Sequence, residues 1–103
     1  MALRQASLEA LMPKHAKASL LLVDDDPDLL RLLSIRLKAN GYDVTAVDSG
    51  QRALASIAAS RPDLLLTDLR MEKVDGMQLL RACREKHPEM EVVMITGFAT
   101  AEA

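Results

Sequence analysis

The sequence predicts an α/β fold with a doubly wound parallel sheet, and two observations indicate it. Apolar runs of strand length occupy residues 20–23, 64–67 and 92–95, and segments with helical spacing of apolar residues separate them. Such runs are typical of parallel strands that are buried on both faces of a sheet. Each run also leads into a polar residue, namely Asp24, Asp68 or Thr96. Open α/β sheets bind ligands at the carboxyl edge of their strands, so these residues mark a candidate site.

The first helix follows the first strand directly. Asp25 or Asp26 is placed to cap it, and Pro27 at its first turn is favoured because the missing N–H would have no partner there. Asn40 and Gly41 end the helix, since Gly tolerates the left-handed backbone of a helix terminus. Residues 42–47 then read as a second, more amphipathic strand.

The same alternation continues to the end of the chain. Stop signals at Pro62 and Pro88 close the second and third helices. The expected elements are a helix opening at 48–50, a strand at 64–67, a loop at 71–75, a helix at 76–86 and a strand at 92–95. The order is therefore β-α-β-α-β-α-β, and residues 97–103 look like a loop that enters a further helix.

The chain divides into two parts by this interpretation. Residues 1–18 form an N-terminal leader that we expect to be flexible, because its apolar residues are too scattered to pack. Residues 19–103 form the domain, whose fifth strand and last helices we expect to be missing. In that case strand 92–95 is an open apolar edge, and the first helix has an uncovered face at residues 29–37. Self-association through either surface is expected if these residues are the entire molecule.

Composition excludes several functional classes. A length of 103 residues fits one domain, and a net charge of -2 without a Lys/Arg cluster argues against direct nucleic-acid binding. The single cysteine, Cys83, has no partner for an internal disulfide and is expected to be a small core residue. No signal peptide or run of roughly 20 apolar residues is present, so we expect a cytoplasmic chain without a membrane partner.

The acidic residues at the strand ends point to phosphoryl chemistry. Asp68 is predicted to lie opposite Asp24 and Asp25 at the sheet edge, and carboxylates gathered in this way either hold protons or share a divalent cation. Mg²⁺ takes oxygen ligands from one or two carboxylates, waters and a phosphate. An aspartate next to it is able to attack phosphorus and become an aspartyl phosphate.

Three motifs give this pattern a family resemblance. The segments Leu21-Leu22-Val23-Asp24-Asp25-Asp26-Pro27, Asp68-Leu69-Arg70-Met71 followed by Asp75-Gly76, and Ile95-Thr96-Gly97 resemble those of bacterial response-regulator receiver domains. The resemblance runs from about residue 19 to the end of the chain. It is strongest to receivers of the nitrogen-regulator type, and it implies a flavodoxin-like fold.

The resemblance implies roles for individual residues and partners. Asp68 would be the phosphoacceptor and Thr96 the switch hydroxyl that contacts the phosphoryl group. Mg²⁺ would be held by Asp25 directly, by Asp24 through an outer position, by Asp68, and by the backbone carbonyl of Arg70. The donor would be a sensor histidine kinase, and the phosphorylated domain would switch a separate output domain, transcriptional in this subgroup. The domain would be a signalling module rather than an enzyme.

The chain departs from the family in two places. Glu72 stands where the family usually has proline after the methionine, which adds a negative charge near the acceptor and removes a stiffening residue. The family lysine at the end of a fifth strand has no counterpart, because Lys73 and Lys86 do not follow apolar strands. Phosphorylation of these residues alone is therefore expected to be slow or short-lived.

Two other families fit parts of the pattern less well. A haloacid-dehalogenase-type phosphohydrolase would use Asp24 and Asp26 in an Asp-x-Asp motif, but that family favours a small or β-branched residue where this chain has Asp28. It also leaves Asp68 unexplained. A nucleotide-binding α/β domain would need a glycine-rich loop after the first strand, and the sequence has none there. Isolated aspartates of this kind are otherwise ordinary helix caps.

Overall fold

The computed structural model describes residues 18–95, and the predicted alternation of strands and helices is present throughout them. The elements are β1 (Ser19–Val23), α2 (Pro27–Ala39), β2 (Asp43–Val47), α3 (Gly50–Ala59), β3 (Leu64–Asp68), α4 (Gly76–Lys86) and β4 (Glu91–Ile95). Each lies within a residue or two of its predicted position. The expected leader before residue 18, and Thr96 with the segment after it, lie outside the described residues.

The strands form one parallel sheet in the order β2-β1-β3-β4. This order confirms the doubly wound prediction, because the chain moves outward from β1 in one direction to β2 and in the other to β3 and β4. The reversal places the carboxyl ends of β1 and β3 next to each other in the middle of the sheet. Within residues 18–95, no helix is long and apolar enough to cross a membrane.

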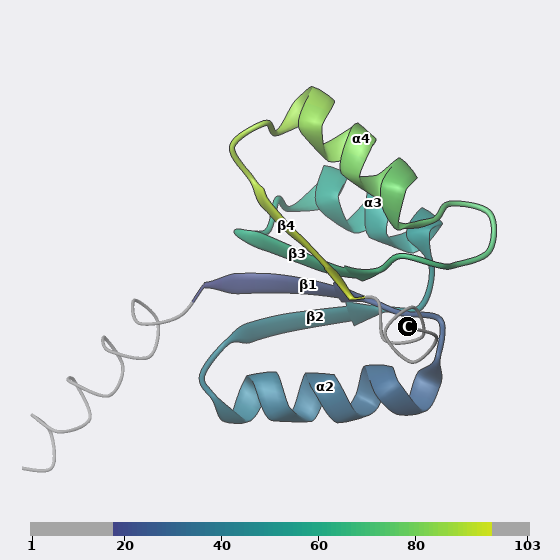
Figure 1. Cartoon of the computed structure of the whole chain (residues 1–103). Helices are drawn as coiled ribbons and strands as arrows, with labels where there is room; N and C mark the ends of the chain where they lie inside the picture. The colour runs from purple at the N-terminus through teal and green to yellow at the C-terminus, as the bar shows by residue number, and fades with distance from the viewer. Residues whose placement is uncertain (1–17, 96–103) are drawn as a thin grey trace, which may run out of the picture.

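Helices cover both faces of the sheet (Figure 1). On one face α2 packs its half-buried Leu30, Leu33 and Leu37 against Leu20 and Leu22 of β1. On the other face α3 and α4 lie together and close a larger core. That core consists of Leu21, Val23, Ala53, Ile57, Leu65, Leu79, Cys83 and Met90, all of which are buried. Alternate side chains of β1 thus enter opposite cores, as expected for a strand with helices on both sides.

Capping side chains set where each helix begins. Asp26 caps α2, and its carboxylate accepts hydrogen bonds from the backbone N–H groups of Asp28 and Leu29 at 3.0 and 3.4 Å. The structure therefore decides between the two predicted caps in favour of Asp26. At α4, Asp75 and Gln78 form a reciprocal capping box, which fixes the first turn of the helix that follows the β3 loop.

The last turn of α2 ends as predicted. Gly41 has a φ of 94°, a backbone conformation that glycine adopts without steric cost. Asn40 supports the terminus because its side-chain amide donates to the Arg36 carbonyl oxygen at 2.8 Å.

β4 lies at one end of the described sheet, with the Val93 side chain 45% exposed. Self-association through this strand remains a prediction.

Candidate metal centre at the carboxyl edge of the sheet

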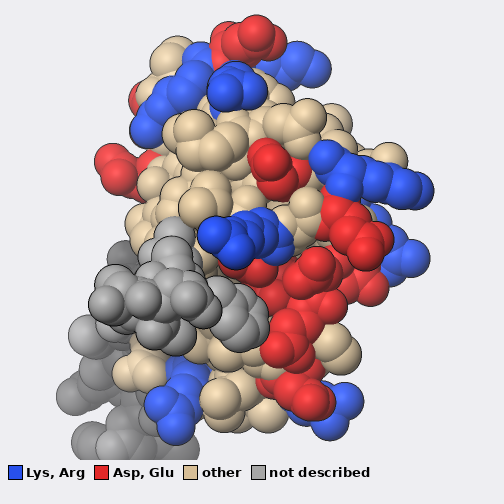
Figure 2. All heavy atoms as spheres, turned by 45° about the vertical axis from the view of Figure 1, so that its right-hand side comes forward, with Lys and Arg blue, Asp and Glu red and all other residues tan. Residues whose placement is uncertain are grey.

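The predicted acidic residues meet where β1 and β3 end. The pairing of Val23 with Thr67 in adjacent parallel strands brings the following residues, Asp24 and Asp68, to the same level of the edge. Asp24, Asp25 and Asp68 each offer a carboxylate oxygen, and these atoms all lie within 4.8 Å of one another. In Figure 2, which turns this edge of the molecule forward, Asp and Glu side chains gather in a contiguous patch. The sequence-based prediction that these three residues converge is confirmed.

The three carboxylates differ in their surroundings. Asp24 is only 2% exposed, whereas Asp25 is exposed and Asp68 is half-buried. Asp24 is held by a hydrogen bond that its Oδ1 accepts from the Asp26 backbone N–H at 2.9 Å, and its own backbone N–H donates to the Val47 carbonyl oxygen. The cluster therefore runs from a fixed, buried carboxylate to one that faces solvent.

Asp68 is also oriented by the backbone around it. Its Oδ1 accepts a hydrogen bond from the Arg70 backbone N–H at 3.3 Å, which leaves the second carboxylate oxygen without this constraint. The fully buried Thr67 donates its hydroxyl to the Asp68 carbonyl oxygen at 3.0 Å. Arg70 thus contributes its N–H to the site, while the predicted role of its carbonyl as a metal ligand stays a prediction.

Burial raises the pKa of Asp24 above its usual value of 3.8. The negative charges of Asp68, Asp25 and Asp26 act in the same direction, and the hydrogen bond from the Asp26 backbone N–H opposes them. A buried carboxylate beside other carboxylates is costly to ionise, and a bound cation would relieve that cost. The electrostatics of the cluster are therefore compatible with a bound cation.

Gly50 and Gly76, the first residues of α3 and α4, also shape the surroundings of the site. A Cβ on Gly76 would lie 2.5 Å from the Asp68 carbonyl oxygen, and one on Gly50 would lie 2.7 Å from Cβ of Val74 in the β3–α4 loop. Both helices approach too closely for any side chain at these positions. The available signal is the repeated pattern of a capping residue followed by glycine, Ser49-Gly50 and Asp75-Gly76.

Three further residues singled out in the sequence, Asp26, Cys83 and Thr96, are not members of the carboxylate cluster. Asp26 uses its carboxylate to cap α2 and is not among the three clustered carboxylates. Cys83 is buried in the core as predicted. Thr96 follows β4 outside the described residues, so its contact with the site stays a prediction.

Comparison with known proteins gives a consistent result. A family model described as "Response regulator receiver domain" matches residues 20–103. The transcriptional regulatory protein GlrR of Escherichia coli is 45% identical over 86 residues, which are 84% of this chain and 19% of that protein. The nitrogen assimilation regulatory protein NtrX of Azorhizobium caulinodans is 39% identical over 85 residues, 81% of this chain and 19% of that protein.

A solved structure supports the same match. The crystal structure of NtrX from Brucella abortus in complex with ADP is similar with a TM-score of 0.75 and 32% identity, over 84% of this chain and 21% of that one. The chain therefore spans about a fifth of the length of these relatives. The similarity includes the strand ends that carry the three clustered carboxylates.

Proposed function

Because this chain belongs to the response regulator receiver family, with nitrogen-regulator-type proteins among its relatives, we propose that it receives a phosphoryl group on the carboxylate of Asp68. The observation that carries the proposal is the convergence of Asp68 with Asp24 and Asp25 at the β1/β3 edge. Asp68 is half-buried, so one side of its carboxylate is open to a donor while the backbone holds the other.

The chemistry follows from that arrangement. A carboxylate oxygen of Asp68 attacks phosphorus, and the bond between phosphorus and the donor nitrogen or oxygen breaks with its electron pair going to the leaving group. The product is a mixed anhydride, an aspartyl phosphate. Asp68 is the member of the cluster suited to this role, because Asp24 is too buried for a donor to reach.

A divalent cation fits the donor set of this site. Three carboxylate oxygens within 4.8 Å of one another are hard ligands of the kind that Mg²⁺ prefers. We assign direct contact to the exposed Asp25 and to Asp68, an outer position to Asp24, and a backbone ligand to the Arg70 carbonyl. When bound, the cation would neutralise negative charge on the transferred phosphoryl group. Thr96 is proposed as the hydroxyl that contacts this group.

The partners of the domain are part of the same proposal. The phosphodonor is a sensor histidine kinase, whose phosphohistidine loses its P–N bond in the step described above. The relatives that carry this region are transcriptional and nitrogen-assimilation regulators several times longer than the matched segment. We propose that residues 19–103 act as the receiver unit of such a regulator, in the cytoplasm.

The haloacid-dehalogenase alternative is not supported. It requires Asp26 as a catalytic acid, but the Asp26 carboxylate accepts two hydrogen bonds from the first turn of α2. The family match also covers the Asp68 motif, which that alternative leaves without a role.

Labelling with a small phosphodonor tests the proposal. Incubation of the protein with phosphoramidate and Mg²⁺ should add one acid-labile phosphoryl group, detected by mass spectrometry of the intact chain. Asp68→Asn should abolish the addition. Asp26→Asn is the matched control, since asparagine caps helices as well as aspartate does and labelling should persist. Equal labelling of the Asp68→Asn protein at another residue would refute the assignment.

A further inference from the structure

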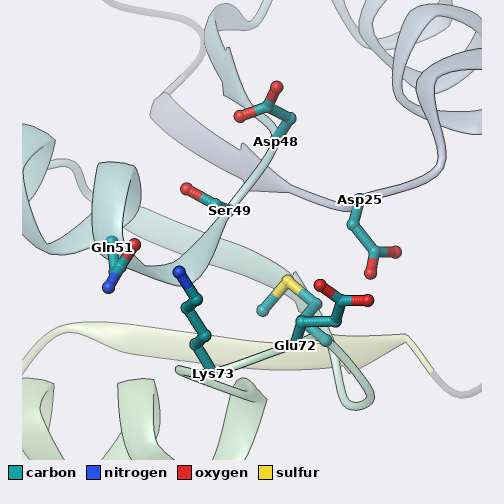
Figure 3. Close-up of a pocket in the computed structure, with 7 residues that line it drawn as sticks. Asp25, Asp48, Ser49, Gln51, Glu72 and Lys73 are labelled. Atoms are coloured by element: carbon teal, nitrogen blue, oxygen red, sulfur yellow. The ribbon is translucent and has the colours of Figure 1, made fainter.

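A cavity of about 370 Å³ lies beside the carboxylate cluster (Figure 3). Asp25 forms one side of it, the turn between β2 and α3 with the start of α3 forms another, and the loop between β3 and α4 forms a third. Its polar and charged lining residues are Asp25, Asp48, Ser49, Gln51, Glu72 and Lys73. Asp25, which is exposed, belongs both to the lining of this cavity and to the carboxylate cluster.

The loop that carries Glu72 is anchored on both sides. Met71 before it and Val74 after it pack against the larger core, and Val74 is also held by the close approach of Gly50. Between these anchors, Glu72 and Lys73 are exposed and line the cavity. The loop therefore presents the two charged side chains from fixed backbone positions, although it lacks the proline usual in the family.

The side chains of Glu72 and Lys73 point in different directions. Lys73 has a φ of 63°, in the left-handed region that non-glycine residues seldom occupy. In Figure 3 the Lys73 ammonium group points toward Ser49 and Gln51, whereas the Glu72 carboxylate points toward Asp25. The positive charge of the loop is thus directed away from the carboxylate cluster, and the negative charge is directed toward it.

We propose that Glu72 is an outer ligand of the divalent cation, accepting hydrogen bonds from the water molecules that the cation retains. This inference rests on the proposed cation site at Asp24, Asp25 and Asp68. Mg²⁺ dehydrates reluctantly and keeps several waters when only a few protein oxygens bind it. Those waters donate outward, and a carboxylate is the strongest acceptor that a side chain offers them. A proline at this position would offer no side-chain acceptor.

Cation affinity is the direct readout. Mn²⁺ binding, followed by the electron paramagnetic resonance signal of the free ion, with Mg²⁺ as competitor, reports affinity without any phosphorylation. Glu72→Gln keeps the size of this exposed side chain, removes its charge and leaves only the weaker amide oxygen as acceptor. It should weaken affinity by about 10-fold, the lower end of the range for residues that orient metal ligands. Asp48→Asn is the matched control. Asp48 lines the same cavity, but it pairs with Arg52 at 3.7 Å and its carboxylate points away from Asp25 in Figure 3.

Salt separates a hydrogen bond through water from a general charge effect. At 1 M ionic strength charges are screened beyond about 3 Å, so any effect of Asp48→Asn should vanish while most of the Glu72→Gln effect remains. Equal effects of the two substitutions at both salt concentrations would overturn the role of Glu72.

Asp25→Ala distinguishes failure of this inference from failure of the cation site itself. Loss of Mn²⁺ binding in Asp25→Ala together with unchanged binding in Glu72→Gln would refute the role of Glu72 alone. Unchanged binding in Asp25→Ala would overturn the cation site and, with it, the role of Glu72. The expected result is loss of binding in Asp25→Ala and weakened binding in Glu72→Gln.

Discussion

Gly76→Ala tests how closely the start of α4 must approach the strand end that carries the phosphoacceptor. The added Cβ would lie 2.5 Å from the Asp68 carbonyl oxygen, 3.0 Å from Cα of Leu69 and 3.1 Å from Sδ of Met94. The two nearest atoms belong to the backbone, so no side-chain rotation relieves the contact. The Gly76 backbone N–H also donates to the Leu69 carbonyl oxygen at 3.1 Å, which ties the helix to the same segment.

Two opposing effects decide the sign of the change in stability. Alanine is a better helix former than glycine by up to about 1 kcal/mol, which would stabilise α4. Ordinary van der Waals contacts of a Cβ atom with a neighbouring heavy atom begin near 3.4 Å. The helix and the β3 end must therefore separate by roughly 1 Å to relieve the contact with the Asp68 carbonyl oxygen. Overpacking of this kind costs about 1–3 kcal/mol in well-packed sites. Because the clash is with backbone, we expect the cost to prevail, with a net loss of roughly 1–2 kcal/mol.

Urea unfolding followed by far-ultraviolet circular dichroism measures this loss. Met77→Ala is the matched control, since Met77 is the next residue of the same helical turn and is 39% exposed. Its free energy of unfolding should change by less than about 0.5 kcal/mol. Because the separation also moves Asp68 away from its neighbours, Gly76→Ala should weaken Mn²⁺ binding as well. A Gly76→Ala protein that is as stable as the parent, or more stable, would show that the close approach is not required.

Two further predictions concern the pH dependence of stability without divalent cation. Since burial and neighbouring carboxylates raise the pKa of Asp24 above 3.8, the native protein binds this proton more tightly than the unfolded chain, and ionisation at higher pH costs stability. Asp24→Asn, which keeps an acceptor for the Asp26 N–H, should therefore be more stable than the parent at pH 7, with a difference that shrinks as the pH falls toward 3.8; a less stable variant at pH 7 would contradict this. Hydrogen bonds from the Ser19 backbone N–H and hydroxyl lower the pKa of Asp63, so its contribution is present above pH 3.8 and lost as the pH falls through the folded value. Asp63→Asn should accordingly melt at a lower temperature than the parent at pH 7 but not at the acid end, and a deficit independent of pH would rule out the carboxylate as its source.

The elements of this protein were predictable from the sequence because they depend on local patterns. Apolar runs and helical spacing place the strands and helices within a residue or two, and turn residues such as Gly41 end them. The candidate site was also predictable, since parallel strands bring their carboxyl ends to one edge and Asp24, Asp25 and Asp68 each follow or end such a strand. The chemistry of three carboxylates then limits what the edge is able to bind.

Contacts between segments distant in the chain decided the cap of α2 and the detailed geometry of the site. The sequence left open whether Asp25 or Asp26 caps α2, and only the path of the chain into the helix assigns the cap to Asp26 and frees Asp25 for the cluster. The approach of Gly76 to Asp68 and the direction of Glu72 toward Asp25 depend on how the β3–α4 loop packs against α3 and β1. A glycine after a capping residue marks where a close approach is possible, but the partner of that approach is decided by the packing of side chains far apart in the chain.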